Sequence, residues 1–152
     1  MQLFIFKFII DYSHNATSDY VYHPINAFQL LKRTYSISIH LNELIKEIPK
    51  LEPLVLSLTS LTDDYGRAHH GIADLHEYLD LDPLDLSKGI IVDSLHGTKH
   101  HSNSKLSSTD LLYIAIEAKK VHYYEGYVNW ISAALKVGKK EGKSAKDLQH
   151  LK

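Results

Sequence analysis

Cysteine is absent from this chain of 152 residues, so neither a disulfide framework nor a thiol nucleophile is available to it. An excess of charge is absent as well. The 17 Lys and Arg residues against 18 Asp and Glu residues leave a formal net charge of -1, which gives no reason to expect nucleic acid as a partner. The remaining composition, 44% hydrophobic and 23% charged, is ordinary for a folded domain with a buried core.

Long hydrophobic runs are also missing. The most apolar stretch, residues 3–10, is interrupted by Lys7 and is far shorter than the roughly 20 residues that span a bilayer, so we expect no membrane span. No basic residues precede it, so it resembles a secretory signal only in part. We expect residues 1–22 to form an N-terminal tail with at most a weak signal. Asn15 begins an Asn-Ala-Thr triplet and is a candidate glycosylation site if the chain enters the secretory pathway.

Familiar catalytic motifs are missing too. The sequence contains no Gly-rich phosphate loop, no G-x-S-x-G and no H-E-x-x-H. It also contains no His-x-Asp, the spacing that supplies two of the three ligands in non-haem iron oxygenases of the two-histidine-one-carboxylate kind. We therefore predict no catalytic residue and no cofactor in this chain.

Histidine, by contrast, is abundant, with 11 residues gathered partly in segments 69–76 and 96–101. Zinc sites need three or four converging ligands. Adjacent positions on a helix point about 100° apart, so His69 and His70 are not expected to share an ion. We interpret these histidines as structural or solvated and predict no metal ligand. A metal-dependent enzyme that uses these clusters remains the alternative hypothesis.

Helical periodicity begins at Pro24, a residue suited to the first turn of a helix, and stops at Pro49. The apolar positions between them return to one face over about six turns. Such a long amphipathic helix usually packs along another helix, in the same chain or in a partner. We predict that it is an association helix whose contacts include Phe28, Leu31, Leu41 and Ile45.

Further helical stretches are expected at residues 54–61 and 63–79. Residues 81–108, rich in Ser, Asp and His, are interpreted as a linker with a short helical turn beginning at Asp82-Pro83. A helix pair follows within residues 109–152, with Thr109 or Ser108 as N-cap. The predicted fold class is all-α, with long amphipathic helices followed by a tetratricopeptide-like helix pair. Aromatic rings stack well on polyproline II ligands, so the candidate peptide-binding residues are Tyr124, Tyr127 and Trp130.

Several ordered blocks carry a resemblance to one family. The segment HPINAFQLLKR, residues 23–33, closely resembles a helix opening in the non-catalytic N-terminal region of collagen prolyl 4-hydroxylase alpha subunits. Residues 68–82 and the Leu-Ser-Lys-Gly at residues 86–89 follow in the same order. Residues 106–135 are similar to the start of the family's peptide-substrate-binding domain. There, the matching positions are Asp110, Ala118, Tyr124, Trp130, Ala134 and Leu135.

The resemblance implies that two parts of the chain have different roles. Residues 23–80 would be a helical assembly region that contacts another alpha-like subunit or a second copy. Residues 109–152 would be an incomplete peptide-substrate-binding domain for proline-rich procollagen peptide. The complete family members are procollagen-proline 4-dioxygenases of the endoplasmic reticulum lumen. They use iron, 2-oxoglutarate and ascorbate in a separate catalytic domain, with protein disulfide isomerase as the beta subunit.

The chain departs from the family pattern in ways that define our expectations. Only 22 residues precede His23 where the family has another long helix, and Lys119 stands where the family usually has Tyr. We therefore expect a non-catalytic portion of an alpha-subunit-like protein, for subunit association and peptide binding. A truncated gene product, with the full activity residing in sequence outside this chain, is a third hypothesis. An association helix without its partner exposes an apolar stripe, so we expect self-association or marginal stability.

Overall fold

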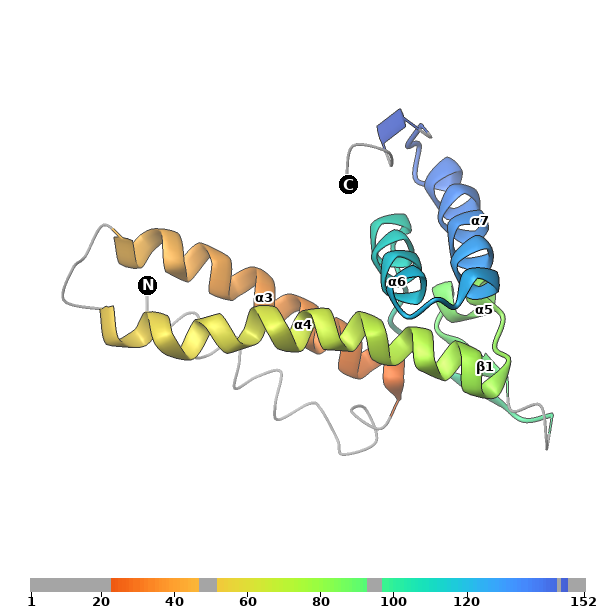
Figure 1. Cartoon of the computed structure of the whole chain (residues 1–152), viewed down its shortest axis with the longest axis horizontal. Coiled ribbons are helices and arrows are strands. Elements are labelled where there is room, and N and C mark those ends of the chain that lie inside the picture. Colours follow the sequence, from red (N-terminus) through yellow and green to blue (C-terminus); the bar gives the residue numbers. More distant parts are fainter. Residues whose placement is uncertain (1–22, 47–51, 93–96, 145, 148–152) are drawn as a thin grey trace.

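The computed structural model of this chain describes residues 23–46, 52–92, 97–144 and 146–147. Two long antiparallel helices, α3 (Pro24–Lys46) and α4 (Glu52–Leu79), lie side by side and form a hairpin that extends away from the rest of the molecule (Figure 1). A short helix, α5 (Pro83–Ser87), and the strands β1 (Ile90–Val92) and β2 (Lys99–His101) connect this hairpin to a second helix pair. That pair is α6 (Ser108–Lys120) and α7 (Tyr124–Lys140), so the predicted all-α class is confirmed.

The long helix expected after Pro24 is present, and it packs along a helix of the same chain. Its first turn is closed by the ring of His23, whose Nδ1 accepts a hydrogen bond of 3.3 Å from the backbone N–H of Ile25. Opposite it, α4 is one continuous helix, so the prediction of two separate stretches divided near residue 62 was wrong. Neither Pro nor Gly occurs between residues 54 and 65, so no residue there interrupts the backbone hydrogen bonds.

The segment interpreted as a linker is more structured than expected. The short helix at Asp82-Pro83 is confirmed: an Asp82 carboxylate oxygen accepts from the backbone N–H of Leu84 at 2.6 Å. The β1–β2 hairpin was not predicted. It pairs antiparallel with Ile91 opposite His100, and it returns the chain to Gly89, whose carbonyl accepts from the N–H of Ser102 at 2.7 Å.

Gly89 is required at this return point by both conformation and space. Its φ of +80° lies in the left-handed region that side chains disfavour. A Cβ atom there would lie 2.3 Å from the backbone oxygen of Ser104. The Leu-Ser-Lys-Gly segment therefore fixes how the connection passes beneath α6.

The α6–α7 pair is packed through small residues. Ser107, rather than Ser108 or Thr109, caps α6 in a reciprocal capping box with Asp110. The predicted cap was wrong by one residue because three consecutive hydroxyl residues precede the apolar pattern. Small side chains let the two helices approach closely. The fully buried ones are Ala115, Ala118, Ala133 and Ala134.

One hydrophobic core joins the two helix pairs. It runs from Phe28 on α3 through Ile72 on α4 to Leu111 on α6 and Trp130 on α7. Among the described residues, no helix combines the length and apolar character that crossing a membrane requires. The hairpin and the α6–α7 pair thus share a common interior at the end where α3 begins.

Candidate functional site

The first half of α3 is joined to the start of α6 by an ion pair between the partly exposed Lys32 and the buried Asp110. Asp110 is 1% exposed, and Lys32 Nζ donates to its two carboxylate oxygens at 2.7 and 2.8 Å. The same carboxylate accepts from the backbone N–H and the hydroxyl of Ser107 at 2.9 and 2.7 Å. A buried charge is tolerated when it is paired and hydrogen-bonded in this way. The pair therefore sets the position of α3 relative to α6.

A second contact reinforces the same junction. Gln29 Nε2 donates to the backbone carbonyl of Lys105 at 2.7 Å, and the Ser102 hydroxyl bonds to the side-chain oxygen of Asn26. Asn26, Gln29 and Lys32 all belong to the sequence block that carries the family resemblance. The polar half of that block thus attaches the helix to the connection that precedes α6.

The apolar half of the block packs into an aromatic cluster made of Phe28, Tyr35, Tyr65, His69 and Tyr113. Phe28 is 2% exposed and lies edge-on to the His69 ring at a centroid distance of 4.9 Å. Tyr35 stacks on Tyr65 at 4.6 Å, and His69 contacts Tyr113 of α6 at 5.5 Å. Such contacts stabilise a helix interface beyond simple area burial. The cluster couples three helices at the base of the hairpin.

Burial determines the chemistry of this cluster. It lowers the pKa of His69 and raises that of the Tyr65 hydroxyl, so both groups are neutral near pH 7. His69 Nδ1 lies 2.8 Å from the Tyr65 carbonyl and therefore carries the proton that it donates. The neighbouring His70 points elsewhere and pairs with Asp74 at 3.5 Å, so the expected divergence of the two rings is confirmed.

The four predicted association residues occupy different environments. Phe28 is covered by the chain's own aromatic cluster, and Leu31 and Leu41 are partly buried. Ile45 lies on α3, but its side chain is outside the described residues. The association role of this set stays a prediction.

Part of the apolar face expected on α3 remains accessible. Leu30, Ile37, Leu41 and Leu44 recur at steps of seven, four and three residues, which places them on one helical face. The first three are partly buried, and Leu44 is 43% exposed. Leu41 belongs to the predicted association set, and Ile37 is the member of this stripe that was not singled out in the sequence.

The three candidate peptide-binding residues also separate. Tyr124 is 59% exposed, whereas Trp130 is fully buried against the ring of His76, at a centroid distance of 5.3 Å. Tyr127 is partly buried, and the ammonium group of Lys119 lies 5.5 Å from its ring centroid. Only the two tyrosines therefore present ring surface, and the peptide-binding role stays a prediction.

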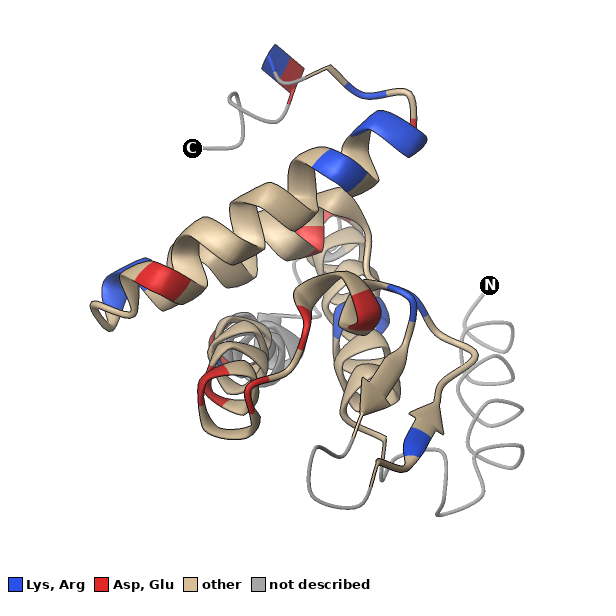
Figure 2. Ribbon diagram, turned by 90° about the vertical axis from the view of Figure 1, so that its right-hand side faces the viewer, with Lys and Arg blue, Asp and Glu red and all other residues tan. Residues whose placement is uncertain are grey.

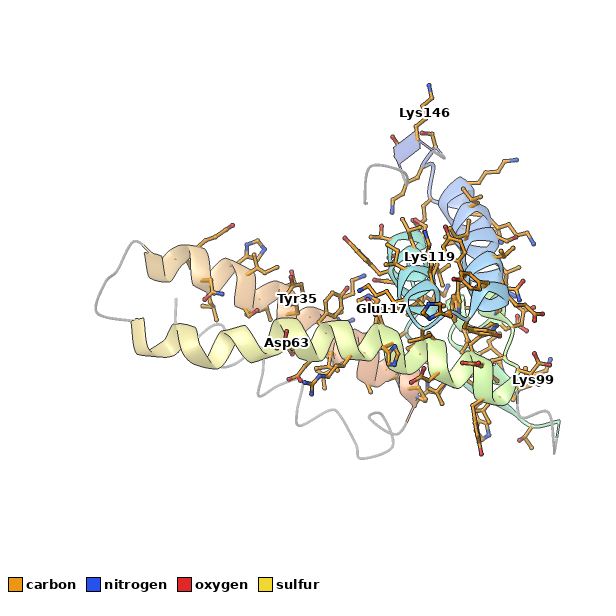
Figure 3. The ribbon with its side chains drawn as sticks, viewed as in Figure 1. Tyr35, Asp63, Lys99, Glu117, Lys119 and Lys146 are labelled. Atoms are coloured by element: carbon orange, nitrogen blue, oxygen red, sulfur yellow. The ribbon has the colours of Figure 1, made fainter. Side chains whose placement is uncertain are left out.

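Tyr124 is the first residue of an outward-facing apolar stripe on α7. Val128 is 62% exposed and Leu135 is 44% exposed, with Ile131 partly buried between them. These positions follow Tyr124 at steps of four, three and four residues, so they share its face. Figure 3 shows side chains crowded along α6 and α7, with Lys119 standing on the α6 side.

Metal binding receives no geometric support from the part of the chain that is described. No three His, Asp or Glu side chains come close enough there to hold an ion. His96 and Asn15 lie outside the described residues. The His69–His76 segment instead contributes rings to the interior.

The comparisons with known proteins give one finding. The family described as "Prolyl 4-Hydroxylase alpha-subunit, N-terminal region" matches residues 5–93, which is more than half of the chain. No curated protein and no solved structure matches. The matched segment contains α3, α4, α5 and β1 and ends before α6. The resemblance of residues 106–135 to the peptide-substrate-binding domain therefore stays a prediction.

Proposed function

Because this chain belongs to the family of prolyl 4-hydroxylase alpha-subunit N-terminal regions, we propose that it is a non-catalytic association module. Its partner is a second copy of itself or another alpha-like subunit. In a complete assembly this would serve procollagen-proline 4-dioxygenase activity in the endoplasmic reticulum lumen, alongside protein disulfide isomerase. Iron, 2-oxoglutarate and ascorbate would belong to a catalytic domain, not to this chain.

The observation that carries the proposal is the apolar stripe on the far part of α3. The hairpin extends beyond the α6–α7 pair (Figure 1), and Leu44 remains 43% exposed there. Leu41, Ile37 and Leu30 continue the same face back toward the junction. A helix face of this kind is stabilised by laying a second apolar helix along it.

The experiment compares two aliphatic residues of α3 whose side chains are similarly exposed. Leu44 is 43% exposed and Ile39 is 40% exposed, but a five-residue step places them about 140° apart on the helix. We expect Leu44→Glu to weaken self-association at least about tenfold, because burying a charge at an apolar interface is costly. Ile39→Glu should leave it unchanged. Sedimentation equilibrium over a range of concentrations measures both.

The result that would contradict the proposal is equal association by the two variants. Circular dichroism should first show that both variants retain the helical content of the parent chain. If Ile39→Glu alone weakened association, the partner would lie on the opposite flank of α3, and the Leu30–Leu44 stripe would have no role in assembly.

A proline-rich peptide is the second proposed partner, bound at the outward face of α7. Tyr124 supplies an exposed ring, and Tyr127 supplies a second one beneath Lys119. Flat rings bind polyproline II segments because the ligand is already rigid and loses little entropy. Trp130 supports this face from the interior, where its indole packs against His76.

A further inference from the structure

A hollow of about 410 Å³ lies where α5, the segment before α6 and the end of α7 meet. Three of the side chains that line it are apolar, namely Leu84, Leu106 and Val137. Leu106 is 3% exposed, whereas the other two are partly buried and pack against the core. The hollow therefore offers apolar surface that an apolar side chain of a ligand would remove from water.

Hydrogen bonds hold the walls of this hollow in place. The backbone N–H of Leu106 donates to the carbonyl of Ser87 at 3.0 Å, which ties the segment before α6 to α5. A carboxylate oxygen of Glu141 accepts from the backbone N–H of Ser108 at 3.1 Å, which ties the end of α7 to the start of α6. The walls are thus fixed within the chain itself, so a ligand would not have to order them on binding.

The charged groups around the hollow are mostly cationic. Lys88, Lys105 and Lys140 line it, and Glu141 supplies the one carboxylate among its described lining residues. The ammonium group of Lys143 lies 2.8 Å from that carboxylate, so its charge is already compensated. Figure 2 shows further basic residues, in blue, gathered at the C-terminal end of α7. The hollow therefore lies in a positive electrostatic field.

Two of these lysines are not paired within the part of the chain that is described. Lys88 lies 2.7 Å from a carboxylate oxygen of Asp85. The ammonium groups of Lys105 and Lys140 make no ion pair or hydrogen bond with any described residue, and both residues are exposed. Their charges are available to carboxylates of a partner, and such charge complementarity favours an acidic partner over a basic one.

We propose that this hollow docks a partner segment in which an apolar side chain is flanked by carboxylates. The apolar side chain covers the surface of Leu84, Leu106 and Val137, and the flanking carboxylates pair with Lys105 and Lys140. Apolar burial supplies the affinity, and the two ion pairs fix the direction in which the segment lies.

The site is separate from both surfaces proposed above. Val137 follows Tyr124 by 13 residues, which places the two about 140° apart around α7. No residue of the Leu30–Leu44 stripe lines the hollow. A failure of this proposal would therefore leave the proposed association unaffected.

The test is a titration of the whole chain with a capped Gly-Glu-Leu-Glu-Gly peptide, followed through the backbone amide resonances of Leu106 and Val137. Two control peptides separate the contributions: Gly-Gln-Leu-Gln-Gly lacks the charges, and Gly-Glu-Gly-Glu-Gly lacks the apolar side chain. We expect saturable shifts with the first peptide and at least about fivefold weaker binding of each control. The affinity for the first peptide should also fall as NaCl is raised, because salt screens exposed charges.

The matched variants remove two lysine charges in two places at the same end of the molecule. Lys105→Gln with Lys140→Gln removes the two unpaired ammonium groups that line the hollow. Lys139→Gln with Lys146→Gln removes equal charge from exposed positions that do not line it (Figure 3 labels Lys146). The first pair should weaken binding at least about fivefold, and the second pair should change it less than about twofold. Circular dichroism should first show that both variants keep the helical content of the parent chain.

Three results would overturn the assignment. They are equal binding of the glutamine peptide, unchanged affinity in the Lys105 and Lys140 variant, or an equivalent loss in the Lys139 and Lys146 variant, which would indicate general attraction to a basic surface. Displacement of the peptide by equimolar inorganic phosphate would show a simple anion site instead. Shifts of the two resonances on dilution of the chain alone, if absent from the Lys105 and Lys140 variant, would assign the hollow to a second copy.

Discussion

His122 and Gly142 adopt the same left-handed conformation at the ends of α6 and α7. Their φ values are +66° and +75°. In both places the N–H group of this residue and that of the residue after it donate to carbonyl groups in the last turn of the helix. At α6 the N–H groups of His122 and Tyr123 donate to the carbonyls of Lys119 and Ala118. At α7 those of Gly142 and Lys143 donate to the carbonyls of Lys139 and Gly138. The two sites share this backbone geometry, but one residue has a side chain and the other does not, so they form a natural pair for measuring the cost of the conformation.

The residue-scale prediction concerns both positions. We expect His122→Gly to raise the free energy of unfolding by about 0.5–1 kcal/mol, because it relieves the left-handed strain but adds glycine entropy to the unfolded state. Gly142→Ala should lower it by about 1 kcal/mol, since nothing within 4 Å would contact the added Cβ and only the backbone conformation is penalised. Urea unfolding measures both. Changes of the same sign in the two variants would contradict this account.

At the same scale, some roles were visible in the sequence and others were not. Pro24 and the Asp82-Pro83 pair have a local signature, so helix starts there were predicted and found. The burial of Trp130 was not predicted, because its partner His76 is 54 positions away in the sequence and only tertiary packing brings the two rings together. The ion pair of Lys32 with Asp110 likewise joins residues 78 positions apart. Local patterns carry no information about such pairs.

At the scale of elements, helices were predictable where their apolar period is long. Residues 24–46, 108–120 and 124–140 have that period and form α3, α6 and α7. The β1–β2 hairpin has only three residues in each strand, with Lys99, His100 and His101 all exposed on β2. Three apolar residues in β1 and three polar residues in β2 show no recognisable alternation, and the pairing of the strands depends on the path fixed by Gly89.

The element-scale prediction concerns the outward face of α7. Replacing Tyr124 with Ala should weaken binding of a proline-rich peptide by about fivefold, the loss expected for one stacked ring. Tyr78→Ala is the matched control, because Tyr78 is 88% exposed on α4 and lies outside this face. Isothermal titration with a Pro-Pro-Gly repeat peptide measures both. An equal loss in the two variants would indicate nonspecific aromatic adhesion rather than a binding surface.

At the scale of the whole molecule, buried histidines link stability to pH. His69 and His76 are 4% and 3% exposed, and burial lowers the pKa of each below its ordinary value of 6.5. The unfolded chain therefore binds protons below pH 6.5 that the folded chain does not. Stability is fully present above that pH and is lost as the pH falls, by up to about 1.4 kcal/mol per pH unit for each such histidine.

The corresponding prediction compares urea midpoints at pH 7.5 and pH 5.5. The parent chain should be less stable at the lower pH. His69→Phe should show a smaller loss, because its ring position among Phe28, Tyr65 and Tyr113 suits an aromatic hydrocarbon. His40→Phe is the control, since the His40 side chain is 74% exposed. An undiminished pH dependence in His69→Phe would mean that this histidine is not the source.

The whole molecule is thus a long helical hairpin anchored by its base to a second helix pair, with an apolar stripe left along α3. The family match and this stripe together support the proposed association module. The most direct measurement of this central claim is the average mass of the unmodified chain by sedimentation equilibrium. The account predicts that the mass rises with concentration from that of one chain toward that of two. A chain that stays monomeric at every concentration, alone and mixed with an alpha-like subunit, would contradict it.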